Sequence, residues 1–221
     1  MFSYSPKIVT NGLVLYLDAA NPNSYVSGST TWRDISRGGN NGTLVGGPGY
    51  SGSNGGSVVF DGSNDYVDLG NVASLNFTTP FSIGCWFNRN TIQPSVDSAI
   101  IGNINGIYTG YMLWYNGNTV DFYFNSGVRT NSPTTITANR WYHVMGIWTG
   151  TSAQVYLNGE LNVSTAYAIA PSNGSPLFTI GQYQSSRNFA GNVSICTAYN
   201  RPLDATEILQ NYNATKGRFG L

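Results

Sequence analysis

The sequence predicts an all-β fold, a sandwich of two antiparallel sheets that ends in one short helix. Short runs of alternating apolar and polar residues recur along the 221-residue chain, and turns such as Asp-Gly and Asn-Gly separate them. Aromatic residues make up 14% of the chain and charged residues only 9%, a composition that can bury a core and is not typical of disorder. We therefore expect a single domain over residues 1–221, with its core at about 11–215.

Predicted strands occur along most of the chain, and turn residues bound each of them. We expect strands at residues 13–17, 58–60, 66–69, 81–87, 111–115, 120–124, 141–148, 155–157, 178–180 and 193–199. After the first strand, residues 19–56 are rich in Asn, Ser and Gly and predict a long loop that Trp32 and Tyr50 anchor. In the strand at 120–124, alternation places Asp121 and Tyr123 on the face opposite the apolar side chains.

Only the C-terminal region predicts a helix. Asp204 is a favourable N-cap residue, and Glu207 three positions later completes a capping box. Gly217 is the predicted stop, because glycine commonly follows the last helical residue. Arg201 lies close enough in the sequence to pair with this helix cap, so we expect it to be structural.

The charge distribution restricts the partners. Ten acidic and ten basic residues balance without a cluster of either sign, so we expect neither nucleic acid nor a membrane as a partner. No run approaches the ~20 apolar residues of a membrane span. The apolar run 12–17 is too short for a signal-peptide core, which predicts a protein made in the cytoplasm without a secretion signal.

Two cysteines, Cys85 and Cys196, lie in apolar strand-like runs. Free cysteine behaves as a small buried apolar residue, and this is one interpretation of the pair. A disulfide is the other, and it requires Cα atoms within about 7 Å of each other. The sequence leaves both open.

Five segments occur in the order and spacing of one known family. They are VVFDGSNDYVDLG at 58–70, FSIGCWF at 81–87, RWYHVMGIW at 140–148, VYLNGE at 155–160 and FAGNVSICTAYNRPLDATEI at 189–208. From about Asn11 to its end the chain resembles the concanavalin A-like lectin/glucanase superfamily, in particular its laminin G-like branch. The resemblance implies a jelly roll with one concave sheet. Members of the family bind glycans, proteins or each other, some are glycanases, and many bind calcium.

The carboxylates do not fit a glycanase. Glycoside hydrolysis needs two carboxyl groups that flank the scissile bond. Glu160 falls in a hairpin turn and Glu207 in the helix cap, and neither has a carboxylate two or four positions away. Asp65 and Asp68 are three residues apart and would point to opposite faces of a strand. His143, the single histidine, belongs to a predicted core strand, so we predict no catalytic site.

Asp61, Asn64 and Asp65 are the candidate calcium ligands. They place two carboxylates and an amide within five residues, and Ca²⁺ prefers such oxygen ligands. Asp18 is a further candidate. The alternative is a tight turn in which the Asp and Asn side chains bond their own backbone. Relatives carry acidic residues near the metal on the last strand, and Ser-Ile at 194–195 replaces them here, which argues against a metal.

Four residues are the candidate carbohydrate ligands, because sugar sites combine aromatic rings with planar polar side chains. They are Trp114, Asp121, Tyr123 and Tyr156. The aromatic members alternate with apolar neighbours, which favours a position on the concave face. Turn residues that adjoin them are Asn116, Asn118 and Asn125. The alternative is packing beneath loops or in an interface, where Tyr and Trp are enriched for the same amphipathic reason.

Two non-catalytic functions remain. The segments GLVLYLDAANPNSY at 12–25 and QNYNATKGRFGL at 210–221 resemble single-domain proteins of tailed bacteriophages. This resemblance implies a virion protein that is a capsid decoration, fibre or tail-associated subunit. It would be made in the host cytoplasm, contact other virion proteins or copies of itself, and adhere to host glycans. The alternative is a stand-alone soluble carbohydrate-binding lectin module.

Overall fold

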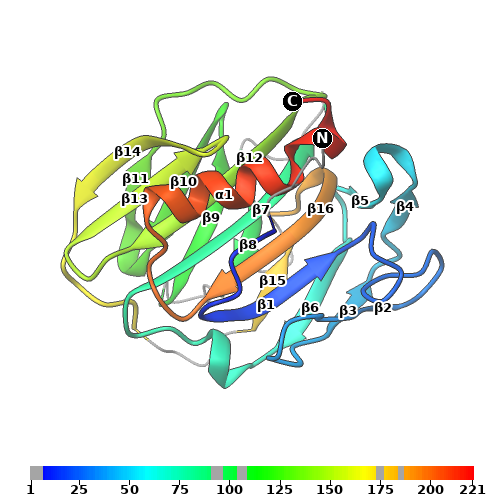
Figure 1. Cartoon of the computed structure of the whole chain (residues 1–221), viewed down its shortest axis with the longest axis horizontal. Helices are drawn as coiled ribbons and strands as arrows, with labels where there is room; N and C mark the ends of the chain where they lie inside the picture. The colour runs from blue at the N-terminus through cyan, green and yellow to red at the C-terminus, as the bar shows by residue number, and fades with distance from the viewer. Residues whose placement is uncertain (1–6, 91–96, 104–108, 173–176, 184–186) are drawn as a thin grey trace, which may run out of the picture.

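Two antiparallel β-sheets pack face to face, and one helix lies on the outer face of one sheet (Figure 1). The computed structural model describes residues 7–90, 97–103, 109–172, 177–183 and 187–221. Each sheet contains eight strands, and neighbouring strands pair in antiparallel fashion. This arrangement confirms the predicted two-sheet sandwich with a short C-terminal helix.

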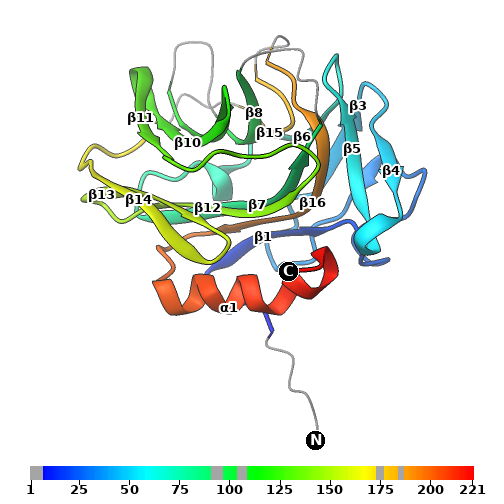
Figure 2. The ribbon, with the colours of Figure 1, turned by 90° about the horizontal axis from the view of Figure 1, so that it is seen from above.

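Sheet A forms the layer next to the helix (Figure 2). In spatial order its strands are β14 (Glu160–Ala166), β13 (Ser152–Leu157), β12 (Trp141–Trp148), β7 (Phe81–Arg89), β16 (Ala190–Tyr199), β5 (Ser57–Asp61) and β4 (Gly49–Ser51). The strand β1 (Leu13–Asp18) also pairs with β16. The central strands β7 and β12 are buried on both faces, which explains their nearly continuous apolar sequences.

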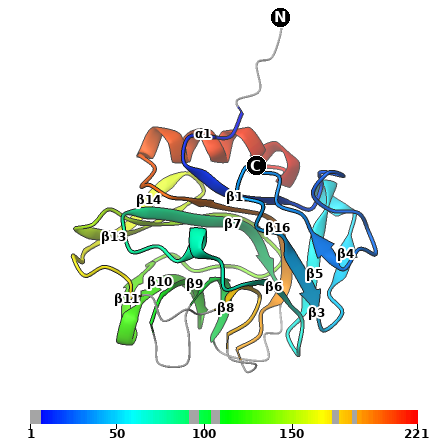
Figure 3. The same cartoon turned by 90° about the horizontal axis from the view of Figure 1, so that it is seen from below.

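Sheet B forms the opposite layer (Figure 3). In spatial order its strands are β11 (Val128–Asn131), β10 (Thr119–Phe124), β9 (Tyr111–Asn116), β8 (Asp97–Gly102), β15 (Phe178–Ile180), β6 (Tyr66–Gly70), β3 (Gly42–Val45) and β2 (Thr31–Trp32). Its inner side chains interlock with those of sheet A. The ring centroid of Phe122 on β10 lies 5.9 Å from that of Phe81 on β7.

The two sheets approach closely where β12 lacks a side chain. A Cβ atom on Gly146 would lie 2.8 Å from the ring of Phe122, closer than real Cβ contacts. Glycine at this position therefore lets an aromatic residue of sheet B pack directly on the backbone of sheet A. Each fully buried phenylalanine in this layer contributes about 1.5–3 kcal/mol relative to an exposed one.

The ten predicted strands are all present, and the structure adds six. The stretch 19–56 was expected to be a loop, but it contains the short strands β2, β3 and β4 and the 3₁₀ turn Ser53–Gly55. The other added strands are β8, β11 and β14. The predicted anchors are confirmed, since Trp32 is fully buried and Tyr50 packs against the core.

The helix α1 (Ala205–Thr215) begins as the capping box predicts. The Glu207 N–H donates to Asp204 at 2.9 Å, and the Asp204 N–H donates to the Glu207 carboxylate at 3.1 Å. Arg201 donates to both Glu207 oxygens, at 2.6 and 2.8 Å. Gly217 follows the C-cap residue as expected, but the chain continues as a 3₁₀ turn over Lys216–Phe219. Within the described residues, no helix is long and apolar enough to cross a membrane.

The two cysteines are free and buried. Cys85 on β7 and Cys196 on β16 are directly opposite in the strand register, and both side chains belong to the core between the sheets. Burial raises the pKa of both thiols, and the neighbouring Cys85 adds to the effect at Cys196. They act as small apolar residues in this structure.

Candidate functional site

The outer face of sheet B carries an aromatic cluster outside the main core. We name it the sheet B cluster, and its members are Ala99, Met112, Trp114, Tyr123 and Tyr183. Tyr123 is directly opposite Met112 in the register, and Asp121 is directly opposite Trp114. Directly opposite residues share a face, so Trp114, Asp121 and Tyr123 lie on one surface as alternation predicted. Within the described chain α1 is the single α-helix, and it lies on the other sheet.

Trp114 lies at the centre of this cluster. Its ring centroid is 5.6 Å from that of Tyr183, with an edge-on angle of 74°, and 6.2 Å from that of Tyr123. These three side chains are only 7–8% exposed, so the rings hold one another in place. The Trp114 Nε1 is buried and has no hydrogen-bond partner among the described residues. A buried donor without an acceptor costs about 1–3 kcal/mol, which makes this atom a candidate ligand contact.

Asp121 supplies a buried acid beside Trp114. Its side chain accepts hydrogen bonds from the Asn116 Nδ2 at 3.0 Å and from the Thr119 hydroxyl at 3.2 Å. Burial raises the pKa of the Asp121 carboxyl, and these two donors and Arg129 oppose the shift. The Arg129 guanidinium lies 5.1 Å from the centroid of the Tyr123 ring. Asn116 and Arg129 are partly or fully exposed, so they form an accessible polar rim around the cluster.

Tyr156, the fourth candidate, lies on the other sheet. It belongs to β13 and packs beneath α1 against Met145, Tyr199 and Ile208. Alternation predicted a position on the concave face beside Trp114 and Tyr123, but the structure places Tyr156 on the outer face of sheet A, beneath α1. The structure therefore does not bring Tyr156 together with Trp114 and Tyr123.

The neighbouring turn amides have structural contacts. Asn125 donates to the Ala170 carbonyl at 2.9 Å and accepts from Ser172. The backbone carbonyl of Asn118 accepts the Ile136 N–H at 2.7 Å, and its side-chain oxygen accepts the Tyr115 hydroxyl at 3.4 Å. Of the three turn asparagines, Asn116 is the one that contacts Asp121. Sequence reasoning missed Tyr183, because it follows the short strand β15 and no alternation marks its direction.

The candidate calcium loop forms a self-bonded turn. The Ser63 N–H donates to Asp61 at 2.7 Å, and the Asp61 N–H donates to Asp65 at 3.0 Å. Burial raises the pKa of the Asp65 carboxyl, and the Asp61 N–H opposes the shift. Asn64 is exposed. These bonds match the tight-turn alternative, and no group of three or more His, Cys, Asp or Glu residues in the described regions could hold a metal.

Asp18 does not join this loop. It is opposite Ile195 on β16, whereas Asp61 is opposite Ala190. Five residues of strand separate these positions, a distance of roughly 17 Å. Asp18 instead accepts from the Arg218 guanidinium at 2.9 and 3.0 Å.

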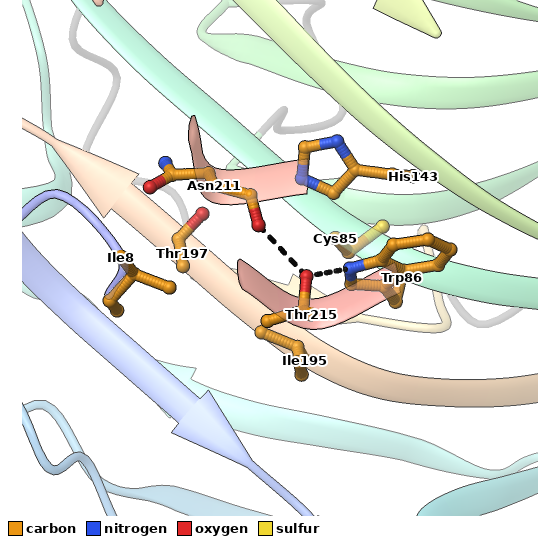
Figure 4. A pocket seen from close by; sticks show the side chains of 8 residues that line it. All are labelled: Ile8, Cys85, Trp86, His143, Ile195, Thr197, Asn211 and Thr215. Carbon is orange, nitrogen blue, oxygen red and sulfur yellow. Dashed lines mark hydrogen bonds between the residues drawn. The ribbon is translucent and has the colours of Figure 1, made fainter. Parts of the chain in front are cut away.

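The outer face of sheet A holds the buried histidine (Figure 4). His143 is 5% exposed beneath α1, with its ring centroid 5.3 Å from that of Trp86. Burial lowers the pKa of His143 to about 3. The Trp86 Nε1 donates to the Thr215 hydroxyl at 2.8 Å. The cavity beside these residues has a volume of about 10 Å³, at the lower limit for one water molecule, so this region is a packed layer.

These features define the protein as a lectin-like β-sandwich, with one outer face under a helix and an aromatic cluster on the other. The sequence model of the concanavalin A-like lectin/glucanases superfamily, in its Laminin_G_3 form, matches residues 61–209. The match spans more than half of the chain, so the chain belongs to this superfamily, as the resemblance implied. None of the proteins with curated functions matches the chain.

Solved structures share the fold at low sequence identity. The binding domain of Paraclostridial Mosquitocidal Protein 1 is 15% identical, with a TM-score of 0.74 over 92% of this chain and 52% of that one. Domain 4 of a Geobacillus stearothermophilus GH43 extracellular arabinanase, in complex with arabinotriose, is 14% identical, with a TM-score of 0.72 over 92% and 100%. Trypanosoma rangeli sialidase is 16% identical, with a TM-score of 0.72 over 98% and 36%.

These coverages differ among the relatives. The chain spans about half of the mosquitocidal binding domain and about a third of the sialidase, but the whole of the arabinanase domain. Identities of this size show a common fold. The activities and ligands of those proteins therefore enter only as support for a proposal.

Proposed function

We propose that the protein is a non-catalytic carbohydrate-binding domain whose glycan site is the sheet B cluster with Asp121. The observation that carries the proposal is the buried, unpartnered Trp114 Nε1 next to a buried carboxyl group on the face without a helix. A sugar hydroxyl would supply the missing acceptor once the neighbouring side chains shift to expose this buried nitrogen. The exposed rim of Asn116 and Arg129 would bond the same ligand from the side.

The related arabinanase domain supports this class of ligand. It matches over its whole length, and its structure contains arabinotriose. A glycan array that includes arabino-oligosaccharides, probed with and without calcium, tests the proposal. We expect binding to at least one glycan that weakens in a Trp114→Phe variant. No binding under either condition would leave the cluster as packing surface only.

We further propose where this domain acts: it is displayed on the particle of a tailed bacteriophage and adheres there to host glycans. It rests on the resemblance of residues 12–25 and 210–221 to phage proteins and on a polar surface with few charges. Partners would then be other virion proteins or copies of this chain. Electron microscopy of purified particles with a specific antibody should show ordered copies. A protein found only free in the lysate contradicts the particle role and favours the alternative, a soluble lectin module.

A further inference from the structure

We infer that a second ligand site, suited to an uncharged polyhydroxylated molecule such as a sugar, lies in a cleft on the rim of the sandwich. The cleft has a volume of about 350 Å³, within the range of small-molecule sites. It lies where β4, the last strand of sheet A, approaches β3 of sheet B. It shares no residue with the sheet B cluster, so it goes beyond the glycan site proposed above.

Two tyrosines contribute the aromatic part of the cleft. The ring centroids of Tyr25 and Tyr50 are 5.4 Å apart, and their planes are tilted by 34°. Tyr25 is 6% exposed and packs edge-on against the fully buried Trp32, with 6.4 Å between centroids. This support fixes the ring positions before any ligand arrives. A fixed aromatic surface binds a sugar ring with little loss of side-chain entropy.

One wall of the cleft is a tight turn at Val26–Ser29. The Ser29 N–H donates to the Val26 carbonyl at 2.9 Å, and the Tyr25 hydroxyl donates to the Ser29 carbonyl at 3.2 Å. Gly28 has φ +84°, the left-handed conformation that a type II turn requires at its third residue. The turn therefore presents backbone and Ser27 to the cleft in a defined shape.

The opposite wall follows β3. Gly46 and Gly47 have φ +90° and +104°, so the chain can turn sharply there. A Cβ atom on Gly46 would lie 2.3 Å from the Asn64 carbonyl oxygen, which shows how tightly this turn is packed. The Leu44 N–H donates to the Thr30 carbonyl at 2.8 Å and ties the two walls together. Both walls are thus held by backbone contacts.

The chemistry of the lining favours a neutral ligand. None of the ten lining residues is charged. The exposed hydroxyls of Ser27 and Thr30 have no hydrogen-bond partner among the described residues, so they can bond a ligand, whereas the Tyr50 hydroxyl lies beside Gly56, outside the lining. Two other grooves are larger, but Arg37 lines the first, at about 630 Å³, and Lys7 and the Asp18–Arg218 pair line the second, at about 420 Å³. The rim cleft alone among these three combines aromatic rings with free hydroxyls and no charge.

Amide chemical shifts of the isotopically labelled protein test this site. The probes are methyl β-glucopyranoside, methyl β-galactopyranoside and arabinotriose, each titrated into the millimolar range. We expect at least one probe to shift the amides of Thr30, Gly49 and Tyr50. A Ser27→Ala/Thr30→Ala variant leaves both tyrosine rings in place, and loss of two hydrogen bonds of about 1 kcal/mol each should weaken that binding by roughly thirtyfold. Thr43→Ala is the matched control, because Thr43 is an exposed hydroxyl residue of β3 that does not line the cleft.

The outcomes separate the two sites. Shifts confined to Trp114 and Tyr123 would support the sheet B site and overturn the cleft. Shifts at Gly49 and Tyr50 that are unchanged in the double variant would also overturn it. Cleft shifts without any response of the sheet B cluster would support the cleft and contradict the proposed glycan site.

Discussion

The two outer faces of the sandwich carry similar aromatic side chains in different surroundings. On sheet A, Trp86 stacks on Phe219 with 4.1 Å between centroids, and its Nε1 donates to Thr215 beneath the C-terminal helix. On sheet B, Trp114 contacts Tyr123 and Tyr183, but its Nε1 has no described hydrogen-bond partner. The Trp86 donor under the helix is satisfied internally, whereas the Trp114 donor on sheet B is unused. The contrast concerns the two indoles alone, because the buried His143 Nδ1 under the helix also lacks a described hydrogen-bond partner. An outward tryptophan therefore indicates binding only when its polar atom is left without a partner.

The largest expected effect is on stability, at the sheet A face. Trp86→Ala should lower the free energy of unfolding by about 3–5 kcal/mol, because it empties the layer beneath Phe219 and Tyr212 and removes the donor to the Thr215 hydroxyl. Equilibrium denaturation in urea measures the change. Leu209→Ala on the exposed side of α1 is the control and should cost far less. A loss below about 1 kcal/mol for Trp86→Ala contradicts the description of this face as a packed layer.

The sequence predicted the strands and their faces, but not which sheet each face belongs to. Tyr123 and Tyr156 show the same alternation, yet one lies in the sheet B cluster and the other beneath α1. A period of two distinguishes inside from outside within one strand. The choice of sheet depends on long-range pairing, and the cover over a face depends on where the helix packs.

There are also physical reasons why some strands were not predicted from the sequence. The edge strand β14 is mostly exposed on both faces, so it has no alternation to recognise. The strands β2 and β4 contain two and three residues, too few for any period to appear. The helix cap, by contrast, was predicted residue by residue, because a capping box involves only neighbours in the chain.

Lowering the pH should reduce the free energy of unfolding through His143, which is buried on the outer face of sheet A. Its pKa in the folded protein is about 3, below the ~6.5 of an unfolded histidine, because burial disfavours the charged ring. The unfolded chain therefore binds the extra proton first as the pH falls. The contribution to stability is complete above about pH 6.5 and is lost progressively down to about pH 3, by at most ~1.4 kcal/mol per pH unit.

Urea denaturation across this pH range checks the slope. A His143→Phe variant lacks the titrating ring, so its stability should change less steeply with pH than that of the parent protein. The stability change that His143→Phe causes at neutral pH measures the contribution of packing alone. Parallel pH profiles for the two proteins would contradict the assignment of this slope to His143.

A matched pair of substitutions compares the two indole donors directly. Trp114→Phe removes the unpartnered Nε1 and should weaken the binding of any glycan found on the array by about tenfold, because one hydrogen bond to the ligand is lost. Trp86→Phe removes a donor that is already satisfied by Thr215 and should leave glycan affinity unchanged while lowering stability. Titration calorimetry measures the affinities. Equal affinities for Trp114→Phe and the parent protein would remove this indole from the site.

Calcium should have the smallest effect on stability. The turn at residues 61–65, where it could bind, lies apart from both aromatic faces. Asp61 and Asp65 already accept backbone N–H groups of their own turn. A cation must compete with these bonds, and Asp18 is committed to Arg218. We expect saturating Ca²⁺, compared with a chelator, to leave the melting temperature nearly unchanged. If Ca²⁺ bound only the folded protein, a concentration a hundred times its dissociation constant would add about 2.7 kcal/mol to the free energy of unfolding. The melting temperature of a domain of this size would then rise by roughly 5–10 °C. A rise of that size, lost in Asp61→Asn, would show that the turn opens to bind metal.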